Sequence, residues 1–175
     1  MSMSSYIANL RAKIGHDLLV VPSATAILRD ARGRVLLARH ADRGVWVPPG
    51  GAVDPGESPA DAAARETWEE VGLVVEPVRV FGVYGGAGYE ILYGNGDRAA
   101  YVMTAFECRI VGGALRPDGE EVLEAGWFGP EEVRGLPAPQ WVREIFDDAA
   151  PEGRARFEPS RWAPGSAGSS GSRGG

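Results

Sequence analysis

Residues 51–73 read GAVDPGESPADAAARETWEEVGL, and they predict a loop that leads into one helix. Ser58 is a preferred N-cap residue, and Pro59 suits the first helical position, where a backbone N–H has no helical partner. Gly72 is a typical helix stop because glycine readily takes the left-handed conformation. We therefore expect a helix from Pro59 to Gly72.

The predicted helix carries three glutamates close together. Glu66, Glu69 and Glu70 stand at i, i+3 and i+4, so they share an arc of about 100°. Like charges at this spacing repel unless a cation neutralises them, and Mg²⁺ binds carboxylate oxygens. The simpler alternative is a solvated acidic face. The other face holds small residues that we expect to pack on a sheet: Ala60, Ala63, Ala64, Thr67 and Val71.

Two charged residues near the start of this helix predict an ion pair. Glu57 lies just before the helix, and Arg65 is the only cation between Glu57 and Glu70. We expect Glu57 to support the site structurally, by pairing with Arg65 and so fixing the loop to the helix.

The spacing of these residues resembles the signature box of the Nudix (MutT-like) hydrolase family. The matching positions are Gly51, Glu57, Arg65, Glu66, Glu69, Glu70 and Gly72. From average residue usage, an accidental match to all of them has odds of about one in a million in such a chain. Thr67 departs from the family pattern, which prefers a larger aliphatic residue there. The resemblance extends over roughly Leu18 to Ala149.

The resemblance implies an enzyme, a metal-dependent pyrophosphohydrolase that uses Mg²⁺ or Mn²⁺. It assigns Glu66, Glu69 and Glu70 as catalytic metal ligands, with Arg65 beside them as a catalytic residue. A backbone carbonyl of Gly50 or Gly51 is a further candidate ligand, since glycine permits close approach and positive φ.

The general base is expected on a later loop. Glu121 is our choice because it stands six residues before Trp127, as in other members, and Glu120 is the alternative. Both could instead be an exposed loop pair.

The substrate implied by the resemblance is a nucleotide-like diphosphate, such as ADP-ribose, a dinucleotide, a nucleotide sugar or a nucleoside triphosphate. Aromatic residues can stack on a base and arginines can bind phosphate, although packing is an equal alternative for the aromatic residues. The candidate contacts are Arg39, Trp46, Tyr84 and Arg98, with Tyr89, Tyr93 and His40 as further possibilities. We expect His16, beside Asp17, to be structural.

Two other functions belong to the same family. One is a catalytically weak ligand-binding or sensor domain, which the complete glutamate set disfavours. The other is a prenyl diphosphate isomerase, which would need a suitably placed catalytic cysteine. Cys108 lies in phase with Phe106 and Ile110 on a predicted strand, so we expect it to fill the core.

Elements along the chain predict an α+β fold, an α/β/α sandwich with a mixed β-sheet between helices. Residues 1–17 are expected to form an N-terminal helix of the same domain, residues 18–150 the Nudix domain, and residues 151–175 a tail that is mobile from about Pro164. Asn95-Gly96 predicts a type I′ turn. The expected helices are 6–14, 59–72, 131–134 and 139–149; the expected strands are 18–28 and 34–39, paired as a hairpin, then 74–84, 100–110 and 121–128.

Composition limits the partners and the compartment. A formal net charge of −6 argues against general nucleic-acid binding, which usually needs a basic face. No apolar run reaches the ~18 residues that a membrane span requires, and no signal peptide is evident. The single cysteine, Cys108, fits a reducing compartment. We expect a cytoplasmic protein without membrane or nucleic-acid partners, and a homodimer because many family members form one.

Overall fold

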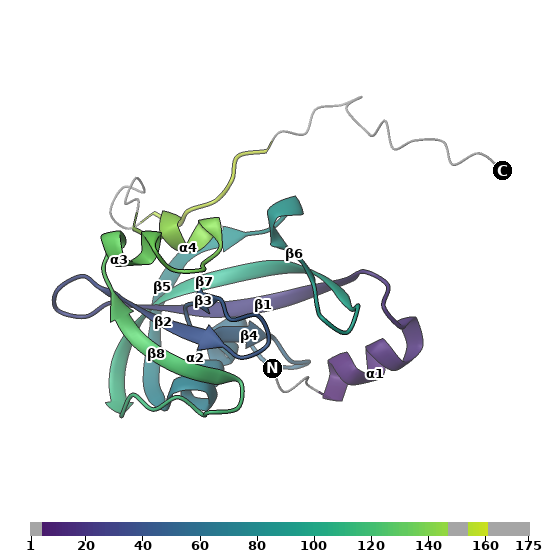
Figure 1. Ribbon diagram of the computed structural model, residues 1–175, viewed down its shortest axis with the longest axis horizontal. Coiled ribbons are helices and arrows are strands. Elements are labelled where there is room, and N and C mark those ends of the chain that lie inside the picture. The colour runs from purple at the N-terminus through teal and green to yellow at the C-terminus, as the bar shows by residue number, and fades with distance from the viewer. Residues whose placement is uncertain (1–4, 147–153, 161–175) are drawn as a thin grey trace.

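The computed structural model describes residues 5–146 and 154–160 of the 175-residue chain. The predicted end of the last helix at Ala149 and the tail from Pro164 lie outside these residues. No helix among the described residues is long and apolar enough to cross a membrane. The elements are α1 (Ser5–Ile14), β1 (Leu19–Leu28), β2 (Val35–His40), β3 (Trp46–Val47), β4 (Gly50–Ala52), α2 (Pro59–Val71), β5 (Leu73–Tyr84), η1 (Ala87–Tyr89), β6 (Glu90–Leu92), β7 (Arg98–Gly113), β8 (Val122–Phe128), α3 (Pro130–Arg134) and α4 (Gln140–Glu144), labelled in Figure 1.

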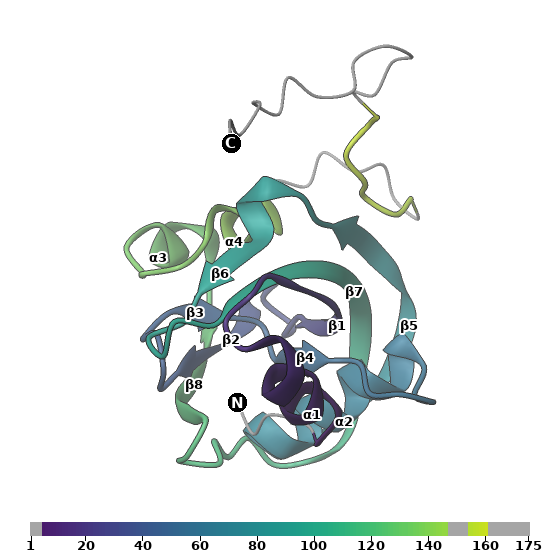
Figure 2. The same ribbon diagram turned by 90° about the vertical axis from the view of Figure 1, so that its right-hand side faces the viewer.

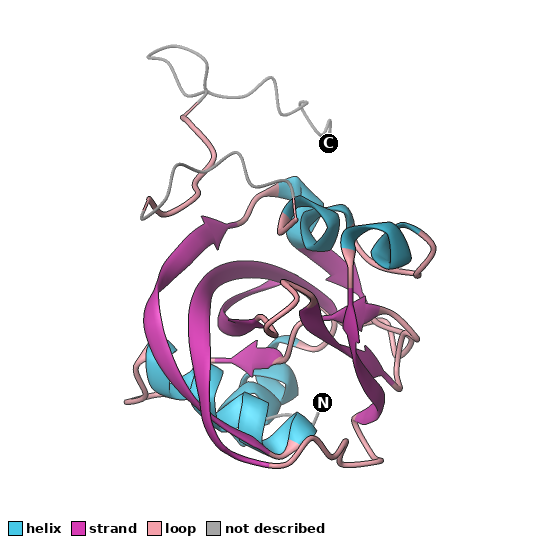
Figure 3. Cartoon of the chain, turned by 90° about the vertical axis from the view of Figure 1, so that its left-hand side faces the viewer, coloured by secondary structure: helices cyan, strands magenta, loops and turns pink. Residues whose placement is uncertain are grey.

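The strands form two sheets, and the predicted α+β class with a mixed sheet is confirmed. The larger sheet has the order β4-β1-β7-β5, with β6 also paired to β7. In it β1 and β7 run parallel, and the other pairs are antiparallel. The smaller sheet, β3-β2-β8, is antiparallel throughout. Figure 3 shows helices on opposite sides of the strands, and Figure 2 shows β5 and β7 curving around the outside.

Helix α2 follows its sequence signals closely. The Ser58 side chain accepts a hydrogen bond from the Asp61 backbone N–H at 3.1 Å, and Gly72 ends the helix at φ +71°. Ala62 and Ala63 are fully buried, so the helix approaches strands β1 and β5 closely. The predicted helix is confirmed to within one residue.

The predicted hairpin of residues 18–28 and 34–39 is wrong beyond its turn. The turn forms, because the Gly33 N–H donates to Asp30 and the strands bridge at Arg29 and Val35. From there β1 pairs with β7 and β2 pairs with β8. Both strands are buried along most of their length, as strands covered on both faces are. Each therefore sits inside its own sheet instead of pairing with its neighbour in sequence.

The tight turn predicted for residues 93–97 forms, because the Tyr93 N–H donates to the Asp97 carbonyl at 2.9 Å, but its expected type I′ geometry is wrong. That turn needs positive φ at both central residues, but only Gly96 has it, at +90°. The Gly96 N–H donates to the carbonyl of Tyr93, so the central residues are Gly94 and Asn95. The Asn95 side chain accepts a hydrogen bond from the Asp97 N–H at 3.0 Å, which stabilises this different turn.

Helix α1 is attached to the same turn region. The Arg11 guanidinium donates to the carbonyls of Asp17 and Arg98 at 2.7 and 2.6 Å. His16 Nδ1 lies 2.8 Å from Asp97 Oδ1, which confirms the structural role expected for His16. These bonds hold α1 against the β6–β7 hairpin.

Cys108 is buried on β7, as predicted for a core residue. Burial raises the pKa of its thiol to about 12, so the thiol is protonated and a poor nucleophile at neutral pH. This placement gives no support to an isomerase that depends on cysteine.

Candidate active site

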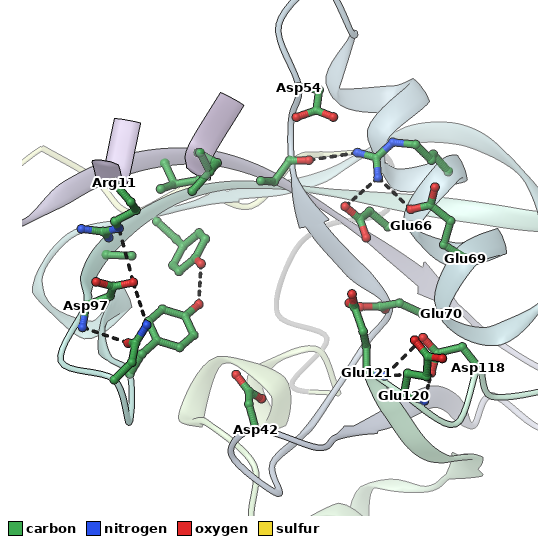
Figure 4. A pocket seen from close by; sticks show the side chains of 18 of the residues that line it. Arg11, Asp42, Asp54, Glu66, Glu69, Glu70, Asp97, Asp118, Glu120 and Glu121 are labelled. Atoms are coloured by element: carbon green, nitrogen blue, oxygen red, sulfur yellow. Dashed lines mark hydrogen bonds and ion pairs between the residues drawn. The ribbon is translucent and has the colours of Figure 1, made fainter. Parts of the chain in front are cut away.

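A cavity of about 760 Å³ lies between helix α2, the β6–β7 turn and helix α1 (Figure 4). Its size falls in the range that holds small organic ligands. Among the described residues that line it, the only cations are Arg11 and Arg65. The acidic lining residues are Asp42, Asp54, Glu66, Glu69, Glu70, Asp97, Asp118, Glu120 and Glu121. Such a lining repels an anionic substrate unless cations accompany it.

The three box glutamates differ sharply in exposure. The side chains of Glu66 and Glu70 are 12% and 3% exposed, whereas that of Glu69 is 55% exposed. We expected one face of α2 to pack on the sheet and the other to bind a cation. Glu70, on the second face, is among the buried residues of the helix and also lines the cavity.

Burial and crowding disfavour the ionised forms of the two buried carboxyls. Burial raises the pKa of Glu66, although the hydrogen bond from Arg65 opposes this. Burial and the charge of Glu66 raise the pKa of Glu70 well above its ordinary value. The charges of Glu121 and Asp118, which line the same cavity, act on the pKa of Glu70 in the same direction. Such a group of acids is stabilised when a cation binds among them.

The glycines before α2 allow the backbone to meet these carboxylates. The Gly50 N–H donates to Glu70 Oε2 at 3.1 Å. A Cβ on Gly51 would lie 2.4 Å from Glu66 Oε1, so no larger residue fits without moving that side chain. The expected positive φ is wrong for both, because neither is among the glycines with positive φ. Close approach alone explains why glycine occupies both positions.

Arg65 connects the lead-in loop to the glutamates. Its Nε and Nη2 donate to the two oxygens of Glu57 at 2.8 and 3.0 Å, which confirms the predicted ion pair. Its Nη1 donates to Glu66 at 2.8 Å and to Glu69 at 3.0 Å. The hydrogen bond from Arg65 lowers the pKa of Glu57, which keeps that carboxylate charged.

The loop before β8 brings Glu120 and Glu121 to the cavity. Asp118 accepts hydrogen bonds from the N–H groups of Glu120, Glu121 and Val122, and its own N–H donates to the Glu70 carbonyl at 3.1 Å. Sequence reasoning missed Asp118, although an Asp-Gly pair in a turn-rich stretch is a signal for such a turn. Figure 4 shows Glu121 beside Glu70.

The structure does not bring the four predicted substrate contacts to this cavity. Trp46 is 8% exposed and packs edge-on against Phe128, with ring centroids 4.9 Å apart. Tyr84 belongs to the same hydrophobic cluster. Arg39 pairs with Glu124, and Arg98 is exposed to solvent and does not line the cavity. Strand alternation turned the two aromatic side chains inward, which a local pattern cannot reveal.

Other residues form the end of the cavity far from the glutamates. Tyr93, one of the further aromatic candidates, does line it, and its hydroxyl lies 2.6 Å from that of Tyr101. Sequence reasoning missed Tyr101 and Ile7, which join the lining through the fold. This end offers aromatic, apolar and amide groups to an organic moiety.

The donor set suits a hard divalent cation. Among the residues that the structure describes, no three His, Cys, Asp or Glu side chains converge as a complete metal site. Mg²⁺, however, commonly takes one or two carboxylates and completes its shell with water and substrate phosphate. Glu66 and Glu70 supply two buried carboxylates on the cavity wall, with Glu121 near Glu70. The residues present therefore fit such an ion.

Comparison with known proteins agrees with this chemistry. A family model described as the NUDIX domain matches residues 20–149. The chain is 31% identical over 145 residues to a MutT-like protein of Streptomyces ambofaciens, covering 83% of this chain and 86% of that protein. It is 34% identical over 125 residues to the NAD-capped RNA hydrolase NudC of Chromobacterium violaceum, covering 69% of this chain but only 42% of that longer relative.

A solved structure shares the fold. The crystal structure of an ADP-ribose pyrophosphatase from Streptococcus suis superposes with a TM-score of 0.54 at 26% identity. The match covers 73% of this chain and 87% of that one.

Proposed function

Because the chain belongs to the NUDIX family, whose members act on phosphoanhydride bonds, we propose that it hydrolyses a nucleoside diphosphate linked to another group, with Mg²⁺ or Mn²⁺ as cofactor. The observation that carries the proposal is the pair of carboxylates on the wall of the acidic cavity, of which Glu70 is buried and Glu66 is 12% exposed. Arg65 pairs with Glu66, and a buried charge on Glu70 is costly unless it also meets a cation.

Each box residue then has a role that follows from its surroundings. Glu66 and Glu70 would hold the metal, with a backbone carbonyl of Gly50 or Gly51 as a further ligand. When bound, the metal would neutralise phosphate charge and lower the pKa of a coordinated water. Glu69, which is 55% exposed, would assist through water. Arg65 would keep Glu66 and Glu69 in place through its hydrogen bonds.

Glu121 is the proposed general base. It lies on the cavity wall near Glu70, and the backbone N–H bonds to Asp118 fix the loop that carries it. Its carboxylate would take the proton of the water that attacks phosphorus, while the anhydride oxygen leaves with the other phosphate. Glu120 is the alternative. Glu121→Gln should lower kcat by at least about a hundredfold, as loss of a general base does, and Glu120→Gln should leave kcat near that of wild type.

The substrate class is inferred from the cavity and from the relatives. NAD and ADP-ribose, named in two of the similar proteins, both carry a diphosphate with an organic group at each end. The acidic end of the cavity would take the diphosphate with its metal, and the end near Tyr93 and Tyr101 one organic group. Since one relative acts on RNA, a capped RNA end is also a candidate substrate, despite the net charge of −6.

A substrate panel tests this proposal. ADP-ribose, NAD, UDP-glucose and a dinucleoside diphosphate resist alkaline phosphatase until they are cleaved, so phosphate released by added phosphatase reports hydrolysis. Nucleoside triphosphates need a separate arm, in which inorganic pyrophosphatase converts released pyrophosphate to phosphate. Turnover of at least one compound with Mg²⁺ or Mn²⁺ is expected, and none with EDTA.

The second candidate is a ligand-binding domain without catalysis. The complete set of glutamates in the cavity favours the enzyme. Binding of a panel compound without hydrolysis under either metal would favour the sensor. A homodimer and a cytoplasmic location stay predictions from the family resemblance.

A further inference from the structure

His40 is a buried histidine beside the candidate metal ligands that the proposed chemistry leaves without a task. It is the last residue of β2, at a register shift in the pairing with β8. Its side chain is 5% exposed, and Nε2 has no hydrogen-bond partner among the described residues. A buried polar atom without a partner is costly, so its position calls for an explanation.

The carboxylate of Glu70 is the group that Nε2 of His40 faces. His40 Nε2 lies 3.7 Å from Oε1 of Glu70, and both side chains are almost fully buried. The other oxygen of that carboxylate, Oε2, accepts the hydrogen bond from the Gly50 N–H at 3.1 Å. The two oxygens of Glu70 therefore face two different groups, one on β4 and one on β2.

The backbone holds His40 in this position. Its N–H donates to the Val45 carbonyl at 3.1 Å, and its carbonyl accepts from the Gly44 N–H at 2.8 Å. These two bonds fix the backbone position from which the imidazole extends. A N–H···O bond has a length of about 2.9–3.0 Å, so a movement of about 0.7–0.8 Å would complete a bond to Glu70.

We propose that His40 is a positioning residue, whose Nε2–H donates to Glu70 Oε1 and fixes the orientation of that carboxylate toward the metal. Both the Nε2–H tautomer and the imidazolium present a hydrogen on this atom, so the role needs no change of protonation. The inference rests on the proposed function, because it takes Glu70 as a metal ligand. Outer groups that orient metal ligands typically change metal affinity by 10–100-fold when they are lost.

Two substitutions separate a hydrogen-bonding role from packing. His40→Gln keeps an N–H donor about as far along the side chain as Nε2, whereas His40→Met has a similar length and no donor. His40→Asn keeps an amide that stops short of Glu70, and it serves if the Met variant does not fold. The matched control is His16→Gln at the other histidine, which contacts Asp97 and not the glutamates.

The main readout is the Kd for Mn²⁺ without substrate, measured by titration calorimetry, beside thermal unfolding and kcat. We expect His40→Met and His40→Asn to weaken Mn²⁺ binding by about 10–100-fold, and His40→Gln and His16→Gln to stay within about threefold of wild type. A folded His40→Met or His40→Asn variant with wild-type Mn²⁺ affinity would overturn the proposal. So would equal weakening by His40→Gln, since the N–H would then not matter.

The same data separate this inference from the proposed function. Wild type that binds Mn²⁺ and hydrolyses a diphosphate, with every His40 variant unchanged, refutes the positioning role alone. Wild type that neither binds Mn²⁺ nor hydrolyses any panel compound refutes the proposed function, and the role of His40 with it.

Discussion

Arg65 and Glu57 meet through two parallel hydrogen bonds, Nε to Oε1 at 2.8 Å and Nη2 to Oε2 at 3.0 Å. Glu57 lies in the loop before α2 and Arg65 in its second turn, so this pair fixes the loop against the helix. The same guanidinium also reaches Glu66 and Glu69. Arg65 thus connects the loop before α2 to the acidic side chains of that helix.

Arg65→Lys should lower the free energy of unfolding by about 1–3 kcal/mol, because an ammonium cannot form this forked pair. Urea unfolding at pH 7 with EDTA measures the loss. The matched control is Arg109→Lys. Arg109 pairs with Glu76, and their side chains are 68% and 56% exposed, so this substitution should lower the free energy of unfolding by less than about 0.5 kcal/mol. Equal losses in the two variants would show that the fork adds nothing.

Alanine at the two glycines before α2 should have two different effects. A Cβ on Gly50 would lie 2.4 Å from the Ala24 carbonyl oxygen and 2.7 Å from Thr25 Cα, and backbone cannot easily give way. Gly50→Ala should therefore cost about 3 kcal/mol of stability.

Gly51→Ala should mainly reduce activity. Its Cβ would meet the carboxylate of Glu66 at 2.4 Å, and that flexible side chain can move aside. We expect a stability loss near 1 kcal/mol but a fall in kcat/KM of at least about tenfold, because a displaced ligand is costly to catalysis. Wild-type kcat/KM in Gly51→Ala would contradict the placement of Glu66 in the site.

Glu70→Gln should reduce kcat by at least about a hundredfold, since an amide is a poor substitute for a charged metal ligand. Glu69→Gln should have a clearly smaller effect, because Glu69 is 55% exposed and so better solvated than Glu66 and Glu70. Steady-state hydrolysis with Mg²⁺ compares them, with exposed Glu76→Gln as the control. Near-normal turnover in Glu70→Gln would show that the assignment of Glu70 is wrong.

The same substitution should stabilise the metal-free protein. Burial raises the pKa of Glu70 above its value in the unfolded chain, so the folded state binds the proton more tightly. That contribution to stability is present below about pH 4.3 and is lost as pH rises through the raised pKa. Glu70→Gln removes this loss, and its Tm at pH 7 with EDTA should exceed that of wild type by about 2–8 °C.

The pH dependence is read from the difference between the two proteins. Burial lowers the pKa of His40 to about 4, so its contribution is lost as pH falls below about 6.5 and opposes that of Glu70. Because His40 lies 3.7 Å from Glu70, the comparison is made with and without Glu70→Gln in proteins that both carry His40→Gln, which removes the titration of His40. A Tm difference that is absent or shrinks as pH rises from 5 to 8 would contradict the raised pKa of Glu70.

Local signals predicted the elements around the site well. Ser58, Pro59 and Gly72 define α2 through caps that act within a few residues, and the glutamate spacing follows from the helix itself. The hairpin prediction failed because a turn signal predicts the conformation of the turn residues but not which strands pair beyond them. The pairing of β1 with β7 joins positions such as Leu19 and Ala99, far apart in sequence, and depends on burial of both faces.

The substrate end of the site could not be predicted in the same way. Trp46 and Tyr84 have the chemistry of base-stacking residues, but the strands turn them into the core. The approach of His40 to Glu70 spans thirty positions and joins β2 to α2, with β3 and β4 between them, so no local pattern contains it. Asp118 was within reach of sequence reasoning, because Asp-Gly turns have a known signal.

Mn²⁺ titration calorimetry on metal-free wild type and on the Glu66→Gln/Glu70→Gln double variant tests the central claim most directly. The account predicts saturable Mn²⁺ binding by wild type and a loss of more than about a hundredfold in affinity in the folded double variant, since even outer-shell changes cost 10–100-fold. Equal affinity in the two proteins, or no binding by wild type with a diphosphate compound present, would contradict it.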